Sequence, residues 1–163
     1  MQGYPAMYEL RLPTQAPFVT LQTALTRTLD AAAAYRHASR LSESRLLANA
    51  CQAFADQRNE QADRIADLID ENGGVPDYGF SGEANFQQLW MTLVSRRFPT
   101  FREGLPRECE RCDRRLERVL LRLINDPQPH RHELGEILRE VRTGLNRLHE
   151  LRDPHGQLPA MSR

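Results

Sequence analysis

Lysine is missing from this chain. Each of its 22 basic residues is an arginine, and 22 acidic residues balance them to a formal net charge of zero at pH 7. A protein without net charge has no long-range field that would draw nucleic acid or an anionic membrane towards it. The composition therefore predicts neither a nucleic-acid partner nor a membrane partner, and any function that depends on charge must be local.

Long apolar runs are missing as well. No run approaches the roughly 20 apolar residues that cross a bilayer. The first stretch, MQGYPAMYELRLPT, has neither a basic leader nor the apolar core of a signal peptide. Cysteine is scarce too, and three residues, an odd number, argue against a disulfide framework. We therefore expect a soluble, cytoplasmic protein, and its 163 residues are enough for a single core.

Prolines and apolar periodicity divide the chain into three parts. Residues 1–16 are predicted to form an N-terminal arm that packs on the bundle or on a partner, residues 17–153 a helical body, and residues 154–163 a C-terminal tail. Helical spacing and capping signals predict five helices in the body. They run from Pro17 to Ser39, from a cap at Ser42 to Asn72, from a cap at Ser81 to Pro99, from Thr100 or Pro106 to Asn125, and from His130 to Asp153.

The side chains expected to face inward follow from the same spacing. The corner between the first two helices should carry a hydrophobic staple of Leu41 and Leu46 around the cap at Ser42. The last two helices should bury a seam of Cys109, Cys112, Leu116, Val119 and Leu123, facing Leu134, Val141, Leu145 and Leu148. The short middle helix should bury Phe86, Leu89, Trp90 and Leu93.

The second predicted helix has amides in the middle of its apolar face. Helical spacing groups four large apolar residues on that face, namely Leu47, Phe54, Ile65 and Leu68. Gln57 and Gln61 interrupt it, and Thr28 of the first helix should lie level with Gln57. Because buried amides must be hydrogen-bonded, we predict a neutral polar layer that fixes the register of the helices.

Two helices joined by a tight corner, a short helix and two more helices describe a four-helix bundle with one long connection. Three stretches narrow this description: LQTALTRTLDAAAAYR, the loop NGGVPDYG with the tryptophan of FQQLWMTL, and LNRLHELRD. Over residues 20–153 the chain resembles the ferritin-like bacterial proteins grouped as domain of unknown function 2383. The resemblance implies an all-α fold, a ferritin-like up-down four-helix bundle with an additional short crossover helix between the second and third bundle helices.

Ferritin-like proteins with a metal centre use one Glu from each of two helices and a Glu-x-x-His from each of the other two. At the corresponding places this chain has Ala32, Gln57, Cys109 or Cys112, and Leu145, and it contains no Glu-x-x-His. The resemblance therefore implies the fold, while the departures from the pattern predict a degenerate metal site. We assign no catalytic residue, no metal ligand and no cofactor.

Cys109 and Cys112 form a C-x-x-C, a spacing that in a loop would suggest zinc or redox chemistry. At two seam positions of a helix, such cysteines are more typical of small buried side chains. The alternative is a metal-binding or redox-responsive site in which Cys51 and an acid such as Glu60 join them.

Two stripes of charge follow helical spacing. The second helix has an acidic stripe of Asp56, Glu60, Asp63, Asp67 and Asp70, and the fourth has a basic stripe of Arg107, Arg111, Arg114, Arg118 and Arg122. The simpler interpretation is two solvated faces with local pairs such as Glu110 with Arg114. Pairing of the stripes between molecules is the alternative.

Together these patterns predict a non-catalytic ferritin-like bundle that acts through its surface as an interaction or stress-associated protein. We expect a homo-oligomer, with a dimer favoured, and a protein partner that the sequence does not identify. A small-molecule carrier is a further hypothesis, and it requires a cavity near Trp90 and Tyr35.

Overall fold

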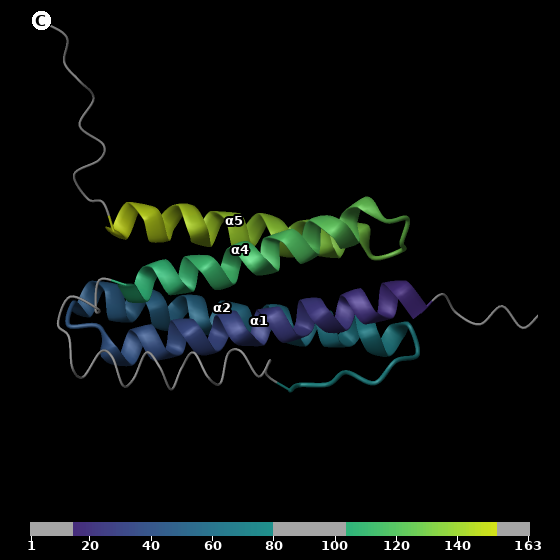
Figure 1. The fold of residues 1–163 in the computed structure, drawn as a ribbon, viewed down its shortest axis with the longest axis horizontal. Coiled ribbons are helices and arrows are strands. Elements are labelled where there is room, and N and C mark those ends of the chain that lie inside the picture. Colours follow the sequence, from purple (N-terminus) through teal and green to yellow (C-terminus); the bar gives the residue numbers. More distant parts are fainter. Residues whose placement is uncertain (1–14, 80–103, 153–163) are drawn as a thin grey trace, which may run out of the picture.

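The computed structural model of the protein describes residues 15–79 and 104–152. These ranges contain four helices and no strand: α1 (Gln15–Leu41), α2 (Arg45–Glu71), α4 (Gly104–Asn125) and α5 (Arg131–Arg152). The helices run alongside one another as an elongated bundle (Figure 1). The predicted all-α bundle is thus confirmed for this part of the chain. None of the described helices is long and apolar enough to cross a membrane.

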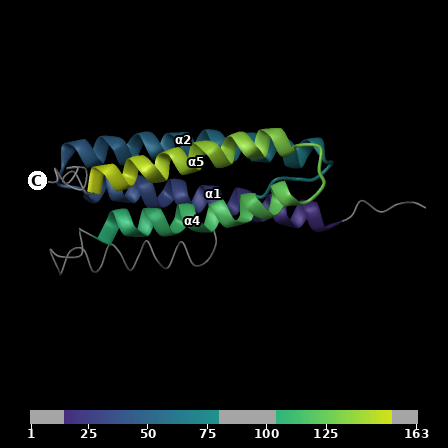
Figure 2. The ribbon, with the colours of Figure 1, turned by 90° about the horizontal axis from the view of Figure 1, so that it is seen from above.

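The four helices stand at the corners of the bundle. α1 packs against α2 and α4, and α5 packs closely against α4 and loosely against α2. Figures 1 and 2, which view the bundle from directions 90° apart, show α2 and α4 at opposite corners. The outer faces of α2 and α4 therefore point in opposite directions.

The corner between α1 and α2 differs from the prediction. Ser44, not Ser42, is the N-cap of α2, and its hydroxyl accepts a hydrogen bond from the Leu47 amide at 3.3 Å. With the helix start moved to Arg45, Leu46 points outward and is 70% exposed. The predicted staple is therefore wrong: Leu41 packs against the core together with Leu47, and Leu46 does not.

The end of α2 follows the prediction. Gly73 has a φ of 75°, the left-handed conformation that glycine adopts without strain. Gly74 lies directly against the ring of Phe18, where a Cβ would collide with it. The chain beyond is tied to α1, because Gln22 donates to the Asp77 carbonyl at 2.7 Å and accepts from the Asp77 amide at 3.0 Å.

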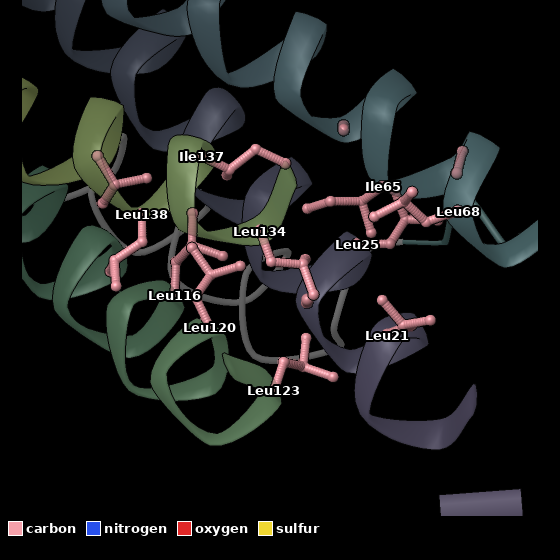
Figure 3. Packing of buried hydrophobic residues seen from close by; sticks show 14 of the residues in the cluster. Leu21, Leu25, Ile65, Leu68, Leu116, Leu120, Leu123, Leu134, Ile137 and Leu138 are labelled. Carbon is pink, nitrogen blue, oxygen red and sulfur yellow. The ribbon is translucent and has the colours of Figure 1, made fainter. Parts of the chain in front are cut away.

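The described residues form a core of two hydrophobic clusters. The aliphatic half is built mostly of leucine and isoleucine from all four helices, including Leu25, Ile65, Leu120 and Leu134 (Figure 3). The mixed half lies towards the α1–α2 corner and contains alanines, thiols and aromatic rings: Ala31, Ala34, Tyr35, Ala38, Cys51, Phe54, Ala55, Leu105, Cys109, Cys112 and Leu148.

The predicted seam of the last two helices is confirmed. Of the nine seam side chains only Val119 is half-buried, and the other eight are buried: Cys109, Cys112, Leu116, Leu123, Leu134, Val141, Leu145 and Leu148. The predicted cap at Ser81 and the middle helix with Phe86, Leu89, Trp90 and Leu93 lie outside the described residues. Most of the N-terminal arm and the C-terminal tail lie outside them too.

Candidate functional site

Arg58 is the largest fully buried side chain among the described residues, with no exposed surface. It lies on the inward face of α2, one turn after Phe54 of the mixed half and one turn before Ala62 of the aliphatic half. Burying an isolated charge is very costly, so a guanidinium persists there only if it is paired and hydrogen-bonded. A buried guanidinium is the most unusual group in the described interior, so the side chains around Arg58 are the candidate site.

Asp113 of α4 is the ionic partner of Arg58. The Nε of Arg58 donates to Oδ1 at 2.9 Å and Nη2 donates to Oδ2 at 2.8 Å, so two parallel hydrogen bonds join the fork of the guanidinium to the carboxylate. Both side chains are completely buried. Since α2 and α4 occupy opposite corners, this pair crosses the centre of the bundle.

Tyr35 of α1 completes the surroundings of the carboxylate. Its hydroxyl donates to Oδ2 of Asp113 at 2.6 Å, and its ring lies 5.8 Å from the Arg58 guanidinium. Burial and the negative charge of Asp113 both raise the pKa of Tyr35 well above its ordinary value. Tyr35 therefore stays protonated and acts as a hydrogen-bond donor.

The charge of Arg58 is equally firmly held. Burial alone would lower its pKa, but the charge and hydrogen bonds of Asp113 outweigh burial and the pKa is raised. Asp113 in turn accepts two hydrogen bonds from Arg58 and one from Tyr35. Because its carboxylate oxygens are occupied by these three hydrogen bonds, Asp113 is poorly placed to act as a general base.

The third nitrogen of Arg58 extends the network towards α5. Nη1 donates to the side-chain oxygens of Gln61 at 3.1 Å and Gln57 at 3.2 Å, and Gln61 donates to Glu140 of α5 at 2.7 Å. Arg64, near the surface, donates to the same carboxylate at 2.9 Å. A continuous network therefore runs from Tyr35 in the core to the surface.

Glu140 is the half-buried end of that network. Burial acts to raise the pKa of its carboxyl, but hydrogen bonds from Gln61 and Arg64 and the positive charge of Arg64 outweigh it, so the pKa is lowered. No buried side-chain nitrogen or oxygen among the described residues lacks a hydrogen-bond partner. The network thus carries the hydrogen bonds that a buried charge requires.

The predicted polar layer is confirmed at Gln61 and altered elsewhere. Gln61 is fully buried, whereas Gln57 is half-buried at the edge of the network. Thr28 is buried as predicted, but its hydroxyl donates to the Ala24 carbonyl at 2.8 Å and so needs no amide opposite it. Thr28 therefore takes no part in the described network, and the predicted neutrality of the layer is wrong, because Arg58 and Asp113 make it ionic.

The three cysteines meet in the mixed half. Their exposed fractions are 0% for Cys51, 1% for Cys109 and 8% for Cys112, and all three are free thiols. Cys51 and Cys109 belong to the same cluster, and the interaction with the Cys109 thiol lowers the pKa of Cys51. Burial raises the pKa of Cys109 well above its ordinary value and that of Cys112 to about 12.

Glu60 does not join these thiols, because it lies exposed on the outer face of α2. Among the described residues, no three histidine, cysteine, aspartate or glutamate side chains are grouped so that they could hold a metal ion. At the four departures from the metal-binding pattern, Ala32, Cys109, Cys112 and Leu145 are buried, and Gln57 is half-buried.

Two surface grooves flank the bundle. One lies between the start of α1 and the end of α4, and it is lined by Thr20, Thr23, Val119, Arg122, Asn125 and Asp126. The other lies at the α1–α2 corner and includes Leu47, Pro106 and Leu151. Tyr35 lines neither groove, and Trp90 lies outside the described residues, so neither groove is the cavity that the carrier hypothesis needs.

Sequence reasoning missed Arg58, Asp113 and Glu140. The signal was present in the spacing: Arg58 lies four residues after Phe54 and three before Gln61, and Asp113 lies three before Leu116. Both positions fall on the apolar seams of their helices. Their charge nevertheless predicts that Arg58 and Asp113 are exposed, since single charged residues are rarely buried.

Comparisons with known proteins do not identify the chain. No protein-family model, curated protein or solved structure matches it.

Proposed function

We propose that this protein is a non-catalytic ferritin-like helical bundle, related to the bacterial domain of unknown function 2383, with a short crossover helix between α2 and α4. In this proposal a guanidinium takes the central place that a metal centre has in metal-containing relatives. The bundle acts through its surface as an interaction or stress-associated protein, and its core is a scaffold.

The observation that carries the proposal is the bidentate pair of Arg58 and Asp113 at the centre of the bundle. The positive charge of Arg58 would repel a divalent cation there. Asp113, a fully buried carboxylate, already accepts three hydrogen bonds. The surrounding side chains are alanine, thiol, amide and leucine, so the donors do not fit a carboxylate-rich metal centre.

The test is metal analysis of the full chain purified without chelators. We expect substoichiometric iron and manganese that are unchanged in the Asp113→Asn variant, because Asp113 is committed to Arg58. One or more equivalents of either metal per chain, lost in that variant, would contradict the proposal. His132→Gln is the matched control, since this exposed histidine forms none of the hydrogen bonds of the network and accounts for adventitious binding.

Thiol oxidation is a second candidate function, favoured by the presence of Cys51 and Cys109 in one buried cluster. Hydrogen peroxide would be reduced to two waters while the two thiols lose their hydrogens and form one disulfide. Because Cys51 and Cys109 are both buried, peroxide reaches their thiols poorly and the reaction should be slow. We therefore rank this candidate second.

Intact-mass analysis after peroxide treatment tests the second candidate. A disulfide that forms in the wild-type protein and in Cys112→Ser, but not in Cys51→Ser or Cys109→Ser, would support it. Unchanged mass in all four proteins would leave the cysteines with packing roles alone.

A further inference from the structure

The outer face of α2 is acidic. The acidic face consists of Asp56, Glu60, Asp63, Asp67 and Asp70, all exposed. Asp56 accepts a hydrogen bond from Gln52 at 3.0 Å. Within the described part of the chain, the other four carboxylates form no ion pair, so this face repels itself and attracts positive charge.

The outer face of α4 is its basic counterpart. The basic face consists of Arg107, Arg111, Arg114, Arg118 and Arg122, all exposed. Arg111 and Arg114 pair with glutamates of their own helix. Arg118 donates only to a backbone carbonyl, and Arg107 and Arg122 have no carboxylate partner among the described residues.

The two faces match in length and spacing. Each has its charges three or four residues apart, and at about 1.5 Å per residue each row extends over roughly 21 to 23 Å. They cannot meet within one molecule, because α2 and α4 stand at opposite corners of the bundle (Figure 2). Elsewhere the charged side chains pair between helices, as Arg142 does with Glu117 and Arg152 with Glu110.

We propose that the acidic face of α2 binds the basic face of α4 of a second copy of this chain. This inference rests on the proposed function, since it names the surface and the partner of an interaction bundle. The charge complementarity of the two faces identifies a second copy as the occupant.

The position of the faces determines the kind of assembly. The contact is heterologous, with a different surface from each copy, and each bound pair still has one free acidic and one free basic face. A dimer is thus the first step of an open or ring-shaped array. Exposed ion pairs are individually weak and screened by salt, so the array should form only at low ionic strength and high protein concentration.

The first experiment is sedimentation velocity of the full chain over a concentration series. We expect the association constant to fall about tenfold or more when the salt concentration rises from about 20 mM to about 500 mM, because the shorter Debye length screens the attraction between exposed charges. Association that does not change with salt, or a monomer at every concentration, would overturn the inference.

The second experiment removes one face at a time. Asp63→Asn with Asp67→Asn weakens the acidic face, and Arg107→Gln with Arg122→Gln weakens the basic face. Neither variant should form arrays alone, but an equimolar mixture should form dimers and stop there, because each variant keeps the face that the other lacks.

Controls with the same charge change keep the test specific. Asp126→Asn with Glu150→Gln, and Arg131→Gln with Arg147→Gln, neutralise exposed side chains outside both faces and should associate like the wild type. Loss of association in these controls as well, or no dimer in the mixture, would contradict the inference. Such a result would not contradict the proposed function, because that proposal is tested separately by metal analysis.

Discussion

The two halves of the core are held in different ways. The aliphatic half is a cluster of branched side chains from all four helices, whose contacts are apolar and without direction. The mixed half has small residues, thiols and two rings, and through Tyr35 it borders the hydrogen-bonded charges of Arg58 and Asp113. Apolar packing tolerates small shifts between helices, whereas paired hydrogen bonds do not. We infer that the aliphatic half supplies most of the stability and that the ionic network sets the register.

Removing the charge of Arg58 should produce the largest loss of stability. In Arg58→Met, Asp113 is left as a buried carboxylate without its counter-ion, and we expect the free energy of unfolding to fall by about 3 to 5 kcal/mol. Chemical denaturation measures it. The control, Arg58→Met with Asp113→Leu, should recover most of the loss, because apolar replacement of a whole buried pair is often nearly neutral. A loss under about 1 kcal/mol in the single variant would refute the importance of the pair.

A truncation in each half sharpens the comparison. Leu120→Ala should cost about 3 kcal/mol, because it leaves a cavity in a fully buried leucine cluster. Cys109→Ala in the mixed half removes one heavy atom and should cost about 1 kcal/mol. Leu46→Ala, on an exposed side chain, is the control and should stay within about 0.5 kcal/mol. Equal losses at Leu120 and Cys109 would show that the halves contribute alike.

Tyr35→Phe tests the link between the mixed half and the ionic network. It removes only the hydroxyl that donates to Asp113, and a hydrogen bond to a charged group is worth about 1.5 to 3 kcal/mol. We expect a loss near the lower end, because Arg58 still holds the carboxylate. Tyr35→Phe should cost less in the variant that carries Arg58→Met and Asp113→Leu. An equal cost in that variant would show that the hydroxyl stabilises the protein independently of the network.

The smallest expected effect is the pH dependence at Glu140. Because its pKa is lowered in the folded protein, its stabilisation is present above the unfolded-state pKa of about 4.3 and is lost as the pH falls through the folded-state value. Glu140→Gln should therefore lower stability at pH 7 by less than about 1 kcal/mol. This difference should vanish in acid. Glu150→Gln, exposed on the same helix, should show no such trend, and a difference that grows in acid would contradict the assignment.

The helices could be predicted from the sequence because their signals are local. Apolar spacing located α4 and α5 and their buried seams, and the predicted end of the second helix at Asn72 lies one residue beyond the last residue of α2. The start of α2 was misplaced because Ser42 and Ser44 are both good capping residues and local sequence does not rank them. With the N-cap placed at Ser42, helical spacing wrongly predicted that Leu46 packs in the hydrophobic staple.

The candidate site could be predicted only in part. Gln61 was found because a polar residue on an apolar face signals a buried polar layer. Arg58 and Asp113 were not found, because each charge is tolerable inside only with the other, and the two are 55 residues apart on helices that share no local signal. Pairing over such a distance is a property of the tertiary fold.

The Arg58–Asp113 pair also bears on the lifetime of the folded state. It joins two hairpins, α1 with α2 and α4 with α5, and the contacts within each hairpin are closer in sequence. Such local contacts tend to form early in folding, whereas the guanidinium can lose its water only when the hairpins dock. An interaction that is absent from the transition state slows unfolding without speeding folding. The buried arginine would then lower the unfolding rate of the bundle and have little effect on its folding rate.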